Sequence, residues 1–228
     1  MEKKKILFLH GAWGAAKNFS PLIEISKNDY ECISIDLPGH GNDKNEIEFS
    51  IENFTAFLLD YISTNFSAPV SVFGYSMGGY IALNAVSQKP QLFDKIMTLA
   101  TKFNWDESEG KKQAQMLNAD KMEEKIPHYA QYLSQLHPAQ NWKNVVSNTS
   151  SLIIQLSSNP PLNTAKLQQV ENPIRLGLGD RDNMVTLTET ADTYKLCKNG
   201  SLYVIPDMQH PIEKINAPLL LAVMQDFF

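Results

Sequence analysis

The chain has 228 residues, of which 43% are hydrophobic and 20% charged, and its formal net charge is −5. This length and composition predict one globular domain with a sizeable core. Acidic and basic residues are scattered along the chain, so no basic patch indicates a nucleic-acid partner, and no apolar run is long enough to predict a membrane span.

The first predicted strand covers residues 4–9 and leads into the loop 10–14, His-Gly-Ala-Trp-Gly. The lysines at its start resemble the start of a signal peptide, but the apolar run is too short for an h-region and no small-residue cleavage site follows. We therefore expect a cytoplasmic protein. Cys32 lies in the second predicted strand, where a buried, inert thiol is expected. Neither Cys32 nor Cys197 has the spacing of a metal ligand, so neither a metal nor a disulfide is expected.

The third predicted strand, residues 70–74, is followed directly by the segment Gly74-Tyr75-Ser76-Met77-Gly78 and by a helical pattern. A G-x-S-x-G segment between a strand and a helix is a nucleophile elbow, in which a sharp turn exposes the serine hydroxyl. Its glycines are needed because side chains there would clash with the neighbouring strand and helix. A serine nucleophile also needs a base, an acid that orients the base, and donors for the oxyanion.

Candidates for the base and the acid follow the last two predicted strands. The strand 173–179 leads into Asp180 and Asp182, and the strand 201–206 is followed by His210. The carboxyl ends of parallel strands are where sites form in α/β sheets, and serine, acid, histidine is the chain order of elbow enzymes. Position along the chain also predicts the two oxyanion donors, which are the backbone N–H groups of Ala12 and Met77.

Together these segments resemble the α/β-hydrolase superfamily over nearly the whole chain. The matching runs are H-G-A-W-G (10–14), D-L-P-G-H-G (36–41), G-Y-S-M-G-G (74–79), G-D-R-D-N-M-V (179–185) and Q-H-P (209–211). The resemblance implies a catalytic triad of Ser76, Asp182 and His210, because a G-x-x-D-x-x-V pattern falls on Asp182; Asp180 remains the alternative acid. The elbow is similar to those of small bacterial carboxylesterases and of enzymes of menaquinone and biotin synthesis, with no single enzyme matched.

Six strand patterns alternate with helical ones, which predicts a parallel sheet with right-handed crossovers. They cover residues 4–9, 31–36, 70–74, 95–100, 173–179 and 201–206. The family's sheet usually begins with two more strands, so we expect a trimmed α/β-hydrolase fold of six parallel strands flanked by helices. Residues 1–101 and 173–228 would form this core. Residues 102–172 are too many for a crossover, and the resemblance implies that they form a helical cap, or lid, over the serine.

Four aromatic residues are predicted to bind the substrate, and they are Trp13, Phe103, Trp105 and Tyr129. Arginine is the usual partner of a substrate carboxylate, yet the only two arginines of the chain lie outside the predicted cap. The lysines of the cap, Lys102 among them, alternate with acids and are interpreted as solvated. These features favour a neutral, moderately apolar substrate.

The remaining histidines are given structural roles. In the resembled family, a histidine at the position of His10 forms hydrogen bonds beside the oxyanion loop. His40 belongs to a turn that Asp36 is expected to brace. His128 and His137 lie in the predicted cap, and both are interpreted as surface residues.

The sequence therefore predicts a serine hydrolase that cleaves a small carboxylic ester through an acyl-enzyme, without a metal or other cofactor. Two alternatives stay open, because fold and triad do not fix the reaction. The same residues would serve thioester, amide or carbon–carbon hydrolysis or a lyase reaction, or the chain would be a non-catalytic ligand receptor. Dehalogenase and epoxide-hydrolase chemistry are disfavoured because those relatives carry an aspartate at the position of Ser76.

Overall fold

The computed structural model of the protein describes residues 3–228. Six strands form one sheet in the order β2-β1-β3-β4-β5-β6, and every neighbouring pair is parallel. The strands are β1 (Lys4–Leu9), β2 (Tyr30–Ile35), β3 (Val70–Tyr75), β4 (Phe93–Leu99), β5 (Ile174–Gly179) and β6 (Gly200–Ile205). The predicted sheet of six parallel strands is thereby confirmed, and every strand end lies within two residues of the predicted one.

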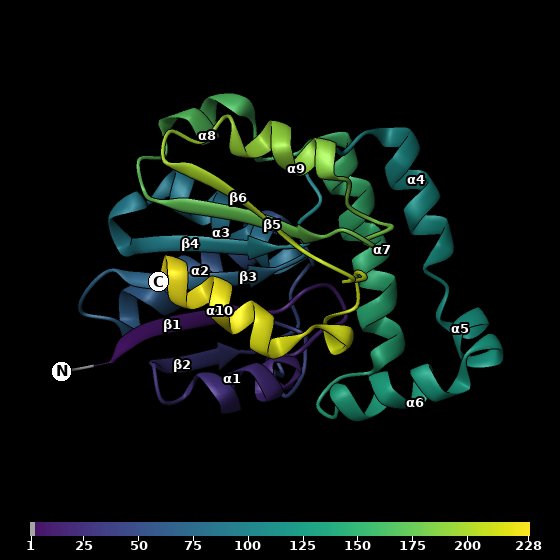
Figure 1. The fold of residues 1–228 in the computed structure, drawn as a ribbon. Coiled ribbons are helices and arrows are strands. Elements are labelled where there is room, and N and C mark those ends of the chain that lie inside the picture. Colours follow the sequence, from purple (N-terminus) through teal and green to yellow (C-terminus); the bar gives the residue numbers. More distant parts are fainter. Residues whose placement is uncertain (1–2) are drawn as a thin grey trace.

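Helices cover both faces of the sheet (Figure 1). Those that connect the strands of the core are η1 (Ala16–Phe19), α1 (Ser20–Ser26), α2 (Ile51–Asn65), α3 (Met77–Gln88), η2 (Pro90–Leu92) and α9 (Leu187–Tyr194), and η3 (Ile212–Lys214) and α10 (Ala217–Phe227) follow the last strand. Five more helices lie between β4 and β5, and they are α4 (Glu107–Met116), α5 (Ala119–Lys125), α6 (Pro127–Leu136), α7 (Trp142–Ser158) and α8 (Thr164–Gln169).

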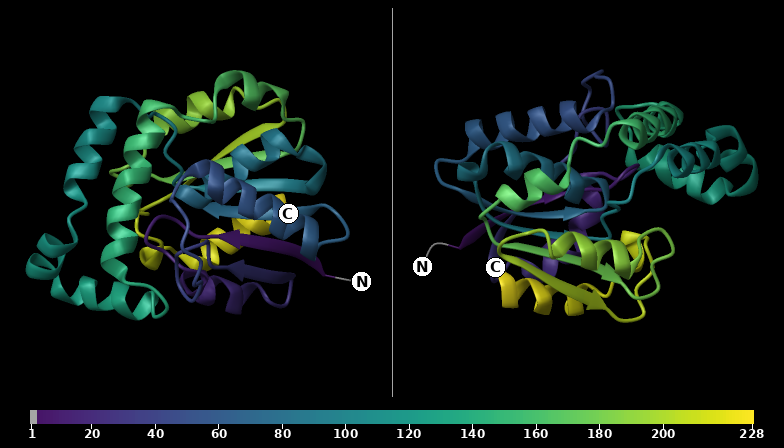
Figure 2. Two further views of the ribbon diagram at one scale, coloured as in Figure 1. Left: turned by 180° about the vertical axis from the view of Figure 1, so that it is seen from behind. Right: turned by 90° about the horizontal axis from the view of Figure 1, so that it is seen from above.

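Alternation along the central strands divides the core into two apolar layers. In β1, Leu7 and Leu9 pack with α2 and α3 on one face, whereas Ile6 and Phe8 pack with α1 and α10 on the other. Successive strand residues point to opposite faces, and a parallel sheet covered on both sides needs apolar residues on both. Figure 2 shows α2 and α10 on opposite sides of the sheet.

The sheet order reverses at β1, which lies between β2 and β3. At such a switch point the loops that leave two adjacent strands diverge to opposite faces and open a crevice at the carboxyl ends. The loop after β1 and the turn after β3 therefore border the same crevice. These two segments contain Ala12 and Ser76.

Helices α4 to α7 lie beyond the carboxyl ends of the strands (Figure 1), and we call residues 102–172, which contain them, the insertion. Apolar residues of α4 and α7, among them Ala114, Leu152 and Leu156, join the core cluster on the α2–α3 face. Helices α5 and α6 pack with the start of α7 in a separate cluster. Helix α8 returns the chain to α3 and the sheet. Within residues 3–228, no helix is both long and apolar enough to span a bilayer.

The close packing of α4 on α7 is testable through Gly110. A Cβ at this position would lie 2.0 Å from Oγ and 2.3 Å from Cβ of Ser157. We expect Gly110→Ala to lower the free energy of unfolding by about 1–3 kcal/mol, because overpacking outweighs the higher helix propensity of alanine. Urea unfolding followed by circular dichroism measures this change. The double variant Gly110→Ala, Ser157→Gly lacks both clashing atoms and should recover stability, and a fully stable single variant would contradict the close approach.

Candidate active site

Ser76 forms a strained turn between β3 and α3. Its backbone has φ 51° and ψ −116°, a conformation that costs a non-glycine residue on the order of 1–3 kcal/mol. Its N–H donates to the carbonyl of Leu99 at 2.8 Å, and Thr101 Oγ1 donates to its carbonyl at 3.0 Å. Glycine is required next to it, since a Cβ on Gly78 would lie 2.3 Å from the carbonyl oxygen of Leu9. The segment therefore has the geometry expected of an elbow.

A continuous series of contacts leads from Ser76 through His210 to Asp182. Ser76 Oγ lies 3.3 Å from His210 Nε2, and His210 Nδ1 lies 2.8 Å from Asp182 Oδ2. Asp182 Oδ1 accepts the N–H groups of Met184 at 2.8 Å and Val185 at 3.0 Å. The structure thus brings the three predicted triad residues together. Asp180, the alternative acid, is exposed and directs no hydrogen bond to His210 among the residues described.

The surroundings of Asp182 favour its charged form. Burial by itself would raise the pKa of this carboxyl group, and its side chain is fully buried. The hydrogen bond to His210, the charge of the imidazolium and the two backbone N–H groups outweigh burial and lower the pKa below its ordinary value. A permanent carboxylate at this position holds the proton of the neutral imidazole on Nδ1. That tautomer leaves the lone pair of Nε2 facing the serine hydroxyl.

Two backbone N–H groups lie beside Ser76 without an acceptor in the part of the chain that is described. They belong to Ala12 and Met77, which line a cavity together with Ser76 and His210. Met77 is the first residue of α3, where unpaired N–H groups and the helix dipole favour a negative charge. The loop that carries Ala12 is a tight turn closed by Gly14 N–H and the carbonyl of Gly11 at 3.0 Å.

Two cavities meet at Ser76 and His210. The smaller one, about 80 Å³, extends toward the start of α2 and α3, and Trp105 is part of its wall. The larger one, about 300 Å³, follows the loop after His210 and includes Trp13 and Tyr129. Phe103, the fourth aromatic residue predicted to bind substrate, lines neither cavity. Its side chain packs on the core cluster.

Part of each cavity wall comes from the insertion, and most of these insertion residues were not assigned from the sequence. Those of the small cavity include Gln113, Thr149, Leu152, Ile153 and Leu156. The helical spacing of the apolar members shows that α7 has a buried face, but not what covers it. Sequence reasoning also treated Lys102 as solvated, which is wrong. Its side chain is 15% exposed, lines the small cavity, and has its ammonium 3.9 Å from Glu109.

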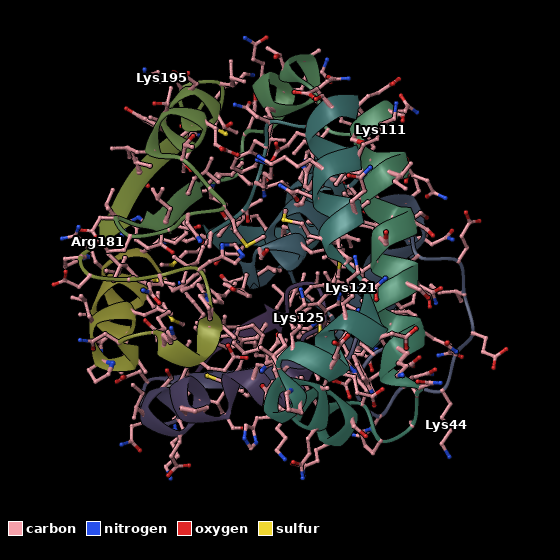
Figure 3. The ribbon with its side chains drawn as sticks, turned by 90° about the vertical axis from the view of Figure 1, so that its right-hand side faces the viewer. Lys44, Lys111, Lys121, Lys125, Arg181 and Lys195 are labelled. Atoms are coloured by element: carbon pink, nitrogen blue, oxygen red, sulfur yellow. The ribbon has the colours of Figure 1, made fainter. Side chains whose placement is uncertain are left out.

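Three other lysines of the insertion are solvated, as expected. Lys111 on α4 and Lys121 and Lys125 on α5 are exposed, and they are labelled in the view onto the insertion in Figure 3. They therefore add no positive charge to the cavity walls.

Three histidines form a buried group beside the candidate site. His10 lies 5.0 Å and His137 5.9 Å from His40, measured between ring centroids. His137 is 1% exposed, so its interpretation as a surface residue is wrong, whereas His128 is exposed. Burial lowers the pKa of His10 from 6.5 to about 4, that of His40 well below its ordinary value, and that of His137 in the same direction. All three rings are therefore neutral at pH 7.

The turn 36–41 is built around the same histidines. Asp36 accepts the N–H of Ala16 at 2.7 Å and that of Asn42 at 2.9 Å, so it joins the turn to the segment after β1. His10 Nε2 accepts the N–H of Leu37 at 3.0 Å, and its Nδ1–H donates to the carbonyl of Gly11 at 2.8 Å. Neither ring nitrogen of His10 is free for the reaction.

Comparison with known proteins agrees with this geometry. Residues 4–124 match the family model described as the alpha/beta hydrolase fold. A pimeloyl-[acyl-carrier protein] methyl ester esterase of Xanthomonas oryzae is 33% identical over 99 residues, which are 42% of this chain and 36% of that protein. The uncharacterized hydrolase YugF of Bacillus subtilis is 28% identical over 43% of this chain and 37% of its own length. The matched segments thus span little more than a third of these relatives.

Solved structures share the fold over nearly the whole chain. NosK from Streptomyces actuosus superposes with a TM-score of 0.85 at 16% identity, covering 99% of this chain and 97% of its own. The enol-lactonase from Burkholderia xenovorans gives a TM-score of 0.76 at 14% identity, covering 100% of this chain and 92% of its own. At these identities the likeness concerns the fold alone.

Because the three histidines are buried in the neutral form, we expect acid to lower the stability of the protein. In the unfolded chain they bind protons below pH 6.5, whereas folded His10 binds one only near pH 4, so stability falls as the pH decreases through this window. His10 alone accounts for a loss of about 2 kcal/mol between pH 7 and pH 5. Urea unfolding at the two pH values measures the loss. His128→Ala, which removes an exposed histidine, should keep the same pH dependence; equal stability at both pH values would contradict neutral buried histidines.

Proposed function

The chain belongs to the α/β-hydrolase fold family, and on that premise we propose that it is a serine hydrolase that cleaves a small, neutral, moderately apolar carboxylic ester through an acyl-enzyme. The observation that carries this proposal is the series of contacts from Ser76 Oγ through the His210 imidazole to the Asp182 carboxylate. A serine hydroxyl is a weak nucleophile until a positioned base removes its proton. The contact with His210 would supply that base.

In the proposed mechanism Ser76 Oγ attacks the ester carbonyl carbon while His210 Nε2 takes the hydroxyl proton. Asp182 keeps the imidazole oriented and stabilises the imidazolium that forms. The carbonyl oxygen becomes an oxyanion, which accepts hydrogen bonds from the N–H groups of Ala12 and Met77. Collapse of the intermediate breaks the bond to the alcohol oxygen, which receives the proton from His210. Water then adds to the acyl-enzyme by the same route and releases the acid and free Ser76.

The insertion is proposed to act as a cap over this reaction. Gln113 on α4 and Thr149 and Ile153 on α7 line both cavities, as Ser76 does. A cap of this kind excludes water from the reacting centre. Hydrogen bonds to the oxyanion are stronger in the resulting environment of low polarity. Residues 102–172 would thus form a functional unit distinct from the core, residues 1–101 and 173–228.

The two cavities suggest which side of the ester each one holds. The leaving oxygen must face His210 to receive its proton, and the large cavity follows Pro211 and Ile212 directly after this residue. We therefore assign the alcohol to the large cavity and the acyl chain to the small one. The small cavity, about 80 Å³ against about 300 Å³ for the large one, gives the acyl chain the narrower space. The substrate would be a short-chain acyl ester of a bulkier alcohol.

A neutral substrate agrees with the charges of the cavity walls. Lys102 is paired with Glu109 at 3.9 Å, and the remainder of the small cavity is mostly apolar. Ester chemistry is supported by the methyl ester esterase among the relatives. The hydrolase named for (E)-2-((N-methylformamido)methylene)succinate, 28% identical over 43% of this chain, supports the alternative that the triad cleaves another bond. A panel of esters, thioesters and amides discriminates between these reactions.

Labelling with a fluorophosphonate probe tests the triad. We expect stoichiometric labelling of the wild type and none of Ser76→Ala, because the probe reacts only with an activated serine. Asp182→Asn should slow ester turnover by about 10⁴-fold through the wrong imidazole tautomer. Asp180→Asn is the matched control, since this neighbouring carboxylate is exposed, and it should react at the wild-type rate. A folded wild type that is not labelled would contradict the proposal and favour a ligand receptor.

Enlarging the small cavity tests the assignment of the acyl chain. Leu156 is 5% exposed and lines the small cavity but not the large one. We expect Leu156→Ala to shift the preference of kcat/KM toward acyl chains two or three carbons longer, at a cost of about 2–5 kcal/mol in stability. Rates on p-nitrophenyl esters from acetate to octanoate measure this shift. Tyr129→Ala, in the large cavity, is the comparison and should leave the acyl preference unchanged; a shift in this variant alone would reverse the assignment.

A further inference from the structure

His137 joins the insertion to the loop that carries Ala12. It directly follows α6, and its Nε2–H donates to the carbonyl of Trp13 at 2.9 Å. Its Nδ1 accepts the N–H of Gly41 at 2.8 Å. Each ring nitrogen thus forms a hydrogen bond with the backbone of a different core loop. His137 is 1% exposed.

The carbonyl that His137 binds belongs to a residue in an unfavourable conformation. Trp13 has φ 59°, in the left-handed region that favours glycine, and it directly follows Ala12. The indole Nε1–H of Trp13 is buried without an acceptor in the described chain, so this side chain adds no hydrogen bond that would fix the loop. A strained backbone persists only where its surroundings hold it.

The other bonds that hold this loop come from the core. His10 binds the carbonyl of Gly11 at 2.8 Å, and Asn18 Oδ1 accepts the N–H of Ala15 at 2.7 Å. Among the described residues, His137 alone brings a side chain of the insertion into hydrogen-bond distance of the backbone of residues 10–16. This bond therefore links the loop directly to the insertion.

We propose that His137 is a positioning residue that keeps the Ala12 N–H aimed at the oxyanion by holding the Trp13 carbonyl. This inference rests on the proposed function, because it assumes that the Ala12 N–H binds a tetrahedral oxyanion. Donors of that kind work through preorganised geometry, and a displacement of about 1 Å at such a site reduces the rate by about 10²-fold. The insertion would then contribute to catalysis through this bond as well as by covering the serine.

The neutral state of His137 fits this role. One nitrogen must donate and the other must accept, which a neutral imidazole does and an imidazolium does not. Burial lowers the pKa of His137 and favours the neutral ring. The two bonds at 2.8 and 2.9 Å require that the proton reside on Nε2.

Two substitutions separate the bonds of His137. The amide nitrogen of Gln occupies nearly the place of Nε2, so His137→Gln keeps the bond to Trp13. The amide oxygen of Asn occupies nearly the place of Nδ1, so His137→Asn keeps only the bond to Gly41. We expect kcat for a good ester to fall about 10- to 100-fold in His137→Asn and in His137→Ala. His137→Gln should recover most of the rate, with KM similar in all folded variants.

The control removes a different contact between the insertion and the core. Gln140 Nε2 donates to the carbonyl of Asp43 at 2.8 Å, near the same turn but away from residues 10–16. Gln140→Ala should retain the wild-type kcat. Thermal unfolding of every variant shows whether a loss of rate merely follows a loss of stability.

A second measurement isolates the oxyanion. A trifluoromethyl ketone forms a tetrahedral adduct with the serine, whereas the corresponding methyl ketone binds without forming one. We expect His137→Asn to lower the affinity for the trifluoromethyl ketone by about the same factor as it lowers kcat. The affinity for the methyl ketone should stay unchanged. Equal rates in His137→Gln and His137→Asn, or equal losses for both ketones, would overturn the inference. Fluorophosphonate labelling of the wild type distinguishes this failure from that of the proposed function, since an unlabelled wild type overturns both.

Discussion

The close approach of α3 to β1 is the contact on which the rest of the site depends. Gly78 in the first turn of α3 lies against the carbonyl of Leu9, with no space for a Cβ. This packing is possible only if the chain turns sharply at Ser76, which takes up an unfavourable backbone conformation. The turn raises the hydroxyl above the strand ends, and it brings the first N–H groups of α3 next to the loop that leaves β1. The positions of the proposed nucleophile and of the proposed oxyanion donors thus follow from one packing constraint.

The other two triad residues are placed by a different part of the sheet. The chain leaves β5 and β6 at the same edge, and two backbone contacts keep the loops together. The N–H of Asp180 donates to Ile205 at 3.1 Å, and the N–H of Arg181 donates to Met208 at 3.1 Å. Tyr75, the residue before the serine, donates its hydroxyl to the carbonyl of His210 at 2.5 Å. Backbone hydrogen bonds thus hold the Asp182 loop against the His210 loop, and the Tyr75 hydroxyl links the His210 backbone to the residue before Ser76.

The sequence was most informative where chemistry is encoded locally. The elbow glycines, Asp182 and His210 each lie at a strand end, and the parallel sheet brings strand ends together whatever the loops do. The choice between Asp180 and Asp182 needed the geometry, because two residues along the chain separate an exposed from a buried carboxylate. Phe103 was predicted to contact the substrate, and Lys102 and His137 were predicted to be solvated. All three predictions fail because the surroundings of these residues depend on how α4 to α7 pack over the sheet. Helical periodicity shows which face of such a helix is apolar, but it does not show which core loop a single polar residue will meet.

His137 illustrates why a polar residue is retained in such a place. Two loops must be joined at a buried point, one through a carbonyl and the other through an N–H. A lysine would bring only donors and a charge to desolvate, and a carboxylate only acceptors. A neutral imidazole presents one donor and one acceptor on opposite sides of a rigid ring, and its burial costs little once both are satisfied. The same neutrality makes the contact sensitive to acid, because a second proton would remove the acceptor for Gly41. A residue suited to hold the oxyanion loop at neutral pH is therefore, for the same physical reason, unsuited to hold it in acid.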